Sequence, residues 1–297
     1  MRLLLLLVPL ALLTACTGAS SGDDLDLKVG GEFGRKPTIV FPAGKPSAEL
    51  QIDELSAGKG AKLAKDDVAI VQYTAHVWDG RENRLVDSSF NRGTPAAFPV
   101  GRLLPGLDKA LQGRAVGSRV IASIPPAEGF GANPPQGIGP DDDLFYVVDI
   151  LGAHARNAHA SGAGTLAGVR VSGGERPRLS IPSGVAPPRA FAARVLERGD
   201  GPKTRAGQLL VTQHEGAVWA GGKVFDSTWK SGQPKAFTIG EGRVIKGWDR
   251  ALVGVPTGSR VLMIVPPSSG YGATGHPQFG ITGADTLVFV VDVLAAY

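Results

Sequence analysis

Short runs of mainly apolar residues recur along the chain and have the length of β-strands. Residues 68–78, 117–124 and 144–151 are rich in Val, Ile, Tyr and Phe, and each run ends at a turn that contains glycine or proline. Both features are typical of strands. Apolar side chains spaced i, i+3 and i+4 occur within 107–111 and again within 248–252, which predicts one short helix in each place. The pattern therefore favours an α+β fold in which an antiparallel sheet packs on a short helix.

The whole pattern occurs twice, at an offset of 139 to 143 residues. The segments that match in order are 29–55 with 171–196, 57–78 with 198–219, 103–111 with 244–252, 117–126 with 258–267, 129–132 with 270–273, and 144–151 with 287–294. A self-similarity of this kind marks homologous units. We therefore predict a first domain at 28–153 and a second at 169–297. The Gly/Ala-rich segment 154–168 between them is predicted to be a linker.

The N-terminus has the proportions of a signal peptide. Arg2 precedes an apolar run from Leu3 to Leu13, which is too short for a bilayer, since a membrane span needs about 20 residues. The sequence LTAC that ends at Cys16 resembles the bacterial lipobox, in which the chain is cut before a cysteine that receives a lipid. An ordinary signal peptide is the alternative. We expect a signal peptide at 1–15, a lipidated tether at 16–27, and a protein outside the cytoplasm that is held at the bacterial cell membrane or shed.

Composition narrows the function classes. The 297 residues include 43 % hydrophobic residues and carry a formal net charge of +4, without a Lys/Arg stripe, so nucleic acid is not an expected partner. A single cysteine rules out an intramolecular disulfide and a cysteine-based metal site. Residues 270–275 fit G-x-G-x-x-G, but the prolines before and after the motif deny it the strand and helix that a dinucleotide site requires. The three aspartates at 141–143 favour a solvated loop over a cation site. No metal or cofactor is predicted.

The second repeat resembles the FKBP-type peptidyl-prolyl cis–trans isomerases. The resemblance rests on FDST (225–228), VIKGWDRAL (244–252), YGATGHP (271–277) and TLVFVVDVL (286–294), in this order. It implies a half-barrel of antiparallel sheet wrapped on a short helix, with an aromatic pocket that receives the proline of an Xaa-Pro bond. It also implies that no cofactor is needed, because the reaction twists a bond and transfers no group.

The resemblance assigns roles to individual residues of the second repeat. Trp248 forms the pocket floor, the Ile245 N–H binds a substrate carbonyl beside Val244, Asp226 orients the site, and Tyr271 donates its hydroxyl. The implied walls and loop residues are Phe225, Phe237, Phe289, His276 and Ile281. Taken alone, Trp248 and Phe289 would favour a plain core, and only together with the other motifs do they favour the pocket. His214 departs from the family, which has tyrosine at this strand position, and Lys235 stands where the family often has an aromatic residue.

The first repeat matches the family less fully. Tyr73 and Asp87 agree with it, whereas Leu107 replaces the floor tryptophan and Phe130 lacks the hydroxyl of Tyr271. The remaining equivalents are Leu103, Leu104 and Tyr146. A shallower pocket is therefore expected in this repeat.

These observations favour an isomerase that assists the folding of exported proteins at the outer face of the cell membrane. Its main site would lie in the second domain, and its partners would be Xaa-Pro segments of unfolded or folding chains. A tethered chaperone that binds proline segments with little turnover is the alternative. A macrolide inhibitor would occupy the same pocket.

Overall fold

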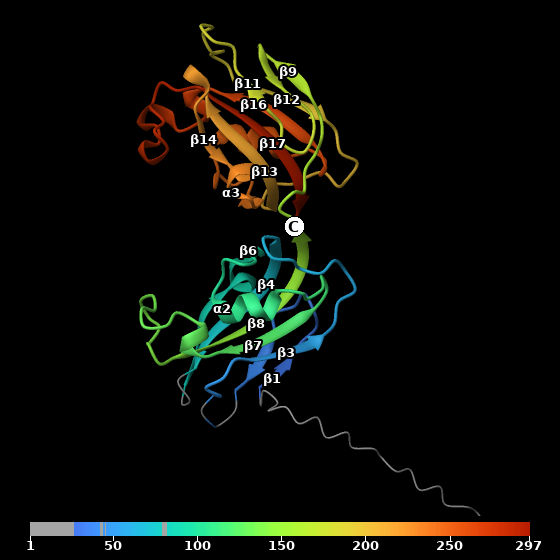
Figure 1. Cartoon of the computed structure of the whole chain (residues 1–297), viewed down its shortest axis with the longest axis vertical. Coiled ribbons are helices and arrows are strands. Elements are labelled where there is room, and N and C mark those ends of the chain that lie inside the picture. Colours follow the sequence, from blue (N-terminus) through green and yellow to red (C-terminus); the bar gives the residue numbers. More distant parts are fainter. Residues whose placement is uncertain (1–26, 42–43, 45, 79–81) are drawn as a thin grey trace, which may run out of the picture.

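The computed structural model describes residues 27–41, 44, 46–78 and 82–297, which form two domains stacked along the long axis (Figure 1). The predicted signal peptide at 1–15, Cys16 and all but the last residue of the predicted tether lie outside the described residues.

The first domain is an antiparallel sheet packed on one short helix. In the order β3-β7-β8-β4-β5, with β6 paired to β4, its main sheet has six strands, and β1 and β2 form a separate hairpin. The elements are β1 (Lys28–Gly30), β2 (Thr38–Val40), β3 (Gln51–Ser56), β4 (Val68–Trp78), β5 (Asn83–Ser88), α1 (Ser89–Arg92), β6 (Ala96–Pro99), α2 (Pro105–Leu111), β7 (Arg119–Ile124) and β8 (Asp143–His154).

The second domain repeats this topology. Its six-stranded sheet has the order β12-β16-β17-β13-β14, with β15 paired to β13, and a three-stranded sheet β11-β10-β9 precedes it. The elements are β9 (Gly164–Leu166), β10 (Val169–Val171), β11 (Leu179–Ser180), β12 (Ala192–Glu197), β13 (Leu209–Val218), β14 (Val224–Ser227), α3 (Thr228–Ser231), β15 (Lys235–Thr238), α4 (Lys246–Leu252), β16 (Arg260–Val265) and β17 (Leu287–Ala296). The predicted α+β fold, two sheets each with a short helix, is confirmed.

Both faces of each main sheet are covered, which explains why its central strands are apolar at every position. Side chains alternate between the two faces of a strand. In β16, Val261 and Met263 pack in the core that contains Trp248 of α4. Leu262 and Ile264 pack on the opposite face, against residues of β10. A strand buried on both faces reads as a continuous apolar run, which accounts for the sequence pattern.

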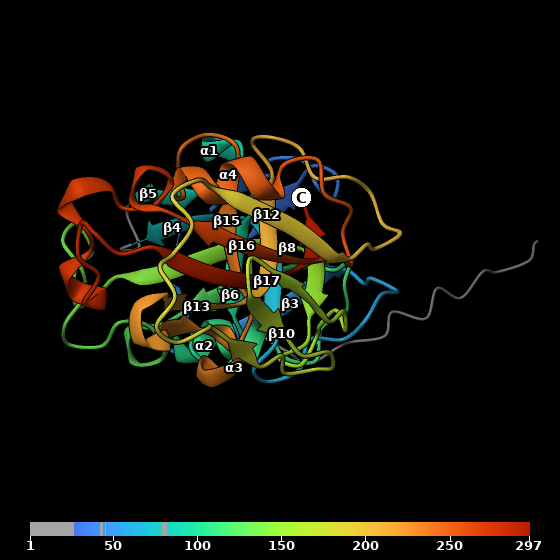
Figure 2. The same cartoon turned by 90° about the horizontal axis from the view of Figure 1, so that it is seen from above.

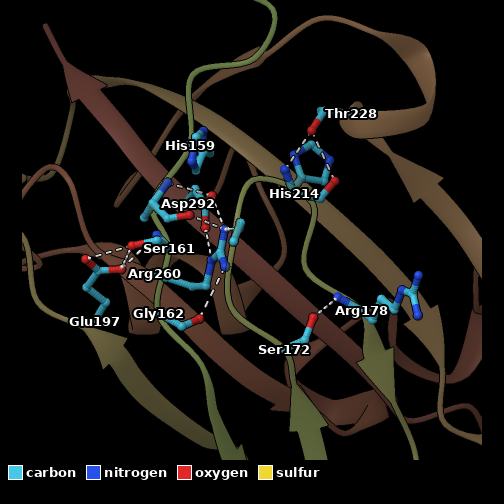
Figure 3. Close-up of polar contacts among 12 residues, drawn as sticks. His159, Ser161, Gly162, Ser172, Arg178, Glu197, His214, Thr228, Arg260 and Asp292 are labelled. Carbon is cyan, nitrogen blue, oxygen red and sulfur yellow. Dashed lines mark hydrogen bonds and ion pairs between the residues drawn. The ribbon is translucent and has the colours of Figure 1, made fainter.

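The segment 154–168, predicted to be a linker between the domains, contains regular structure. It contains the end of β8 and strand β9. The fully buried guanidinium of Arg260 donates hydrogen bonds to the Ala160 and Gly162 carbonyls, and the Ala160 N–H donates to Asp292 at 2.9 Å (Figure 3). A guanidinium has five N–H donors that require acceptors when buried, and the carbonyls of this segment supply them.

The first domain also has a buried arginine that pairs with an aspartate and binds backbone carbonyls. Arg119 pairs with Asp149, with Nε 2.6 Å from Oδ1, and also donates to the carbonyls of Gly31 and Glu32 in the loop after β1. Leu27, the last residue of the predicted tether, is buried against this face of the sheet. Leu27 therefore packs with the first domain, directly before its predicted start at residue 28.

The two domains meet through a small apolar cluster. Ile70 of β4 and Val211 of β13 are fully buried in it. The C-terminal Tyr297 lies between the domains (Figure 1), where its hydroxyl is 2.8 Å from His154 Nε2. A Cβ on Gly152 would come within 1.9 Å of that hydroxyl, so the contact requires glycine there. Viewed along the long axis, helices α2 and α4 lie on opposite sides of the molecule (Figure 2).

Candidate active site

A cavity of about 550 Å³ lies beside α4 in the second domain. Nine of the residues that the sequence assigns to this site line it: His214, Phe225, Asp226, Phe237, Val244, Ile245, Trp248, Tyr271 and Phe289. Arg243 and Lys246 also line the cavity, and sequence reasoning did not single them out. Both residues directly flank Val244 and Ile245 in the sequence, and this adjacency to predicted site residues could have identified them.

The cavity walls come from neighbouring strands. Phe225 of β14 and Phe289 of β17 stand on either side of β13, with ring centroids 5.6 Å apart and planes nearly perpendicular. Between them, β13 carries Gly216, where a Cβ would lie 2.7 Å from atoms of both rings. The close approach of the two rings therefore depends on this glycine.

Trp248 serves the core and the cavity together. It is 4 % exposed and belongs to the main core of its domain, and it also lines the cavity. Its ring makes edge-on contacts with His214 and Phe237, each at 5.2 Å between centroids, and with Phe289 at 5.6 Å. Such pairs favour one ring orientation, so the floor is held rigidly.

His276 and Ile281 are not among the residues that line the cavity, so their contact with substrate stays a prediction. The His276 ring stacks on Phe279 at 4.4 Å and meets the Tyr271 ring edge-on at 4.9 Å. Ile281 is buried in the core, and its carbonyl accepts a hydrogen bond from the His276 N–H. The loop is thus tied together by the His276–Ile281 bridge, and the His276 ring packs on Tyr271.

A polar network fixes the Asp226 carboxylate. It accepts hydrogen bonds from His214 Nε2 at 3.0 Å and from Lys235 Nζ at 2.9 Å. Partial burial would raise the pKa of Asp226, but the hydrogen bonds and charges of these two partners outweigh it and hold the pKa well below its usual range. Lys235 thus takes part in the network from the position where an aromatic residue was expected.

His214 is neutral in this network. Burial lowers its pKa below the usual value, and the nearby Asp226 carboxylate offsets only part of that effect. With Nε2 donating to Asp226, Nδ1 is the acceptor that faces the Thr212 hydroxyl at 3.2 Å. The imidazole therefore donates to Asp226 as the first domain's tyrosine donates to Asp87.

The burial of His214 predicts a pH dependence of stability. Below pH about 6.5 an unfolded histidine binds a proton that the folded His214 resists, so the free energy of unfolding falls as the pH is lowered. We expect a slope of up to about 1.4 kcal/mol per pH unit from this group. Urea titrations between pH 7.5 and 5 should show a smaller slope for His214→Gln than for the parent chain. The exposed His159→Gln is the matched control, and equal slopes in all three proteins would contradict the prediction.

The first domain brings its own equivalents together, with less aromatic surface. The Tyr73 hydroxyl donates to Asp87, and Arg92 pairs with the same carboxylate. Burial raises the pKa of Tyr146 to about 12, and its ring stacks on that of Tyr73 at 6.1 Å. Four further equivalents, which are all apolar, pack in the same core: Leu103, Leu104, Leu107 and Phe130.

The part of the chain that the structure describes holds no group of three or more His, Cys, Asp or Glu side chains placed to bind a metal ion. Within the aspartate cluster at 141–143, burial and the neighbouring Asp142 raise the pKa of Asp143 to about 6.

No helix among the described residues is long and apolar enough to cross a membrane.

The structure is a tandem of antiparallel sheet domains, the second of which holds a cavity lined by aromatic side chains. The family described as FKBP-type peptidyl-prolyl cis-trans isomerase matches residues 59–151 and 201–294, which together exceed half of the chain. The chain therefore belongs to the FKBP-type peptidyl-prolyl cis–trans isomerases, and the predicted family and enzyme class are confirmed.

Individual relatives match one domain or both. The "FK506-binding protein" of Streptomyces anulatus is 36 % identical over 121 residues, which are 41 % of this chain and 97 % of that protein. The human "Peptidyl-prolyl cis-trans isomerase FKBP10" is 27 % identical over 247 residues, which are 82 % of this chain but only 37 % of that longer protein. The crystal structure of the three FKBP domains of wheat FKBP73 covers 84 % of this chain and 94 % of its own at 23 % identity, with a TM-score of 0.33.

Proposed function

We propose that the cavity of the second domain is the main site at which this protein isomerises Xaa-Pro bonds of exported proteins. The observation that carries the proposal is the apolar cavity itself, with Trp248 as its floor and the Tyr271 hydroxyl at its side. The first domain has Leu107 and Phe130 at these two places, which favours the second domain as the more active one.

The geometry suits the reaction. An Xaa-Pro bond isomerises over a barrier of about 18–20 kcal/mol because amide resonance is lost in the twisted state. The twisted bond has less charge separation than the planar amide, so an apolar cavity favours it relative to the ground state. No group transfer takes place, and the residues required are those that bind, orient and exclude water.

Two donors remain available to hold the peptide. The Ile245 N–H precedes the first turn of α4 and has no acceptor among the described residues. The Tyr271 hydroxyl likewise has no partner within the described part of the chain. Burial and the Asp226 charge raise the pKa of Tyr271, so the hydroxyl stays protonated and able to donate. Carbonyls on either side of the proline are the acceptors that we propose.

Exchange NMR on an Xaa-Pro peptide tests the proposal directly. The full chain is compared with the double substitution Asp226→Ala and Trp248→Ala, and with the matched pair Asp87→Ala and Leu107→Ala in the first domain. Catalysis that is lost only in the second-domain variant supports the proposed site. Catalysis lost only in the first-domain variant would move the main site there. Binding without catalysis in the parent chain would favour the chaperone alternative. A macrolide is expected to compete for the same cavity.

We further propose that the protein acts outside the cytoplasm, anchored by a lipid on Cys16. The support is the sequence alone: an apolar run that ends in LTAC. Mass spectrometry of the protein recovered from bacterial membranes should show an N-terminal Cys16 that carries a lipid. A Cys16→Ser variant should leave the membrane fraction. An unmodified Cys16 in the parent protein would exclude the anchor.

A further inference from the structure

Two exposed cations stand at the rim of the second-domain cavity. Arg243 and Lys246 line it, one on each side of Val244 and Ile245, and both side chains are exposed. Neither forms a hydrogen bond or an ion pair with any residue that the structure describes. In contrast, Lys235 is engaged with Asp226, and Arg250 lies over the Phe191 ring.

The carboxylates nearby are already occupied. Asp226 accepts from His214 and Lys235. Asp249 accepts from the N–H groups of Gly240 and Gly242, at 2.6 and 2.9 Å, and so fixes the loop that leads to Arg243. The Glu241 carboxylate lies against Gly207, and Glu241 does not line the cavity. The mouth of the cavity therefore has an uncompensated positive charge.

The first domain lacks this feature although it shares the fold. Arg102 stands at the position of Arg243, but it donates to the Ser231 carbonyl of the second domain at 2.8 Å. Pro105 stands at the position of Lys246. The two unpaired cations thus belong to the second-domain pocket and are not a requirement of the half-barrel.

We propose that Arg243 and Lys246 make the second-domain site selective for Xaa-Pro segments flanked by Asp or Glu. The inference rests on the proposed function and specifies its substrate. A peptide with its proline on Trp248 must leave the cavity past Val244 and Ile245, which brings its neighbouring residues to the two cations. A carboxylate there gains attraction from two charges, and a lysine is repelled by both. Because exposed pairs contribute modestly, we expect a preference of about three- to tenfold.

The test uses three peptides that are identical except for the residues on either side of the Xaa-Pro pair, which are Glu, Gln or Lys. Exchange NMR gives kcat/KM for the full chain, and chemical-shift titration of the same samples gives Kd. The Glu peptide should exceed the Gln peptide, and the Lys peptide should be poorest. The preference should shrink in 0.5 M salt because screening weakens the attraction.

Charge reversal identifies the residues responsible. Arg243→Glu with Lys246→Glu should invert the order of the peptides. Lys203→Glu with Arg205→Glu changes the net charge equally on the same domain, away from the cavity lining, and should preserve the order. Equal kcat/KM and Kd for the three peptides would overturn the inference while leaving the isomerase intact. Absence of turnover with every peptide would refute the proposed function instead, and the Kd values would still decide the charge preference.

Discussion

Asp292→Ala is expected to destabilise the second domain by about 3–5 kcal/mol, because it leaves a buried guanidinium without its counter-charge. The side chains of Arg260 and Asp292 are both 0 % exposed, and their two hydrogen bonds measure 2.6 and 2.8 Å. The same guanidinium donates to the Ala160 and Gly162 carbonyls before β10 (Figure 3) and to the Gly174 carbonyl after it, so its displacement also releases these segments. The substitution therefore weakens the hydrogen bonds to these carbonyls as well as removing the ion pair.

Urea unfolding followed by tryptophan fluorescence measures the effect. Three of the four tryptophans lie in the second domain, so the signal reports mainly on it. Arg260→Met combined with Asp292→Leu should recover much of the stability, since it removes both charges and fills the space. Asp149→Ala is the equivalent substitution in the first domain and should spare the second-domain transition. An unchanged midpoint for Asp292→Ala would show that the buried pair does not hold the domain.

Trp248→Leu is expected to lower kcat/KM for Xaa-Pro isomerisation by at least about tenfold. It gives the second domain the floor residue of the first and removes three edge-on ring contacts. These contacts, at about 0.5–1.5 kcal/mol each, hold the ring orientation. A loss of about 1.4 kcal/mol in transition-state stabilisation when the floor is lost corresponds to a factor of ten in rate. The proline ring would also lose the flat surface on which it is proposed to lie.

The measurement is again exchange NMR on the full chain, with circular dichroism to establish that the variant is folded at the assay temperature. Leu107→Ala empties the corresponding place in the first domain and serves as the matched control. It should keep most of the activity. Full activity in a folded Trp248→Leu variant, together with a large loss in Leu107→Ala, would assign catalysis to the first domain.

Much of the fold and of the site could be predicted because local patterns encode them. The run at 68–78 became β4 with the same bounds, and the apolar spacing at 107–111 lies in α2. Nine predicted residues meet at one cavity because the order of strands and helix is shared with the family. His276 and Ile281 lie outside the cavity lining, since the path of their loop depends on packing such as that of His276 against Tyr271 and Phe279.

The role of the segment 154–168 could not be predicted from its composition. Small residues are typical of a linker, but backbone carbonyls, which every residue has, bind Arg260 there. The local sequence does not indicate that Arg260 binds these carbonyls, because Arg260 lies 98 to 100 residues away from them. The contact between the domains could not be predicted from local sequence either, since it depends on where Tyr297 meets Gly152 and His154.

The sequence by itself determined the two repeats, the central strands and the main short helix of each, the family and most residues of the pocket. These follow from periodicity and from motifs of fixed spacing, which are local properties of the chain. Only the tertiary structure decided which charges are paired and which are left at the cavity rim. Arg102 and Arg243 occupy equivalent positions, yet one contacts the other domain and the other has no partner among the described residues. Pairing depends on distances between segments that are remote in sequence, and these are set only when the domains pack.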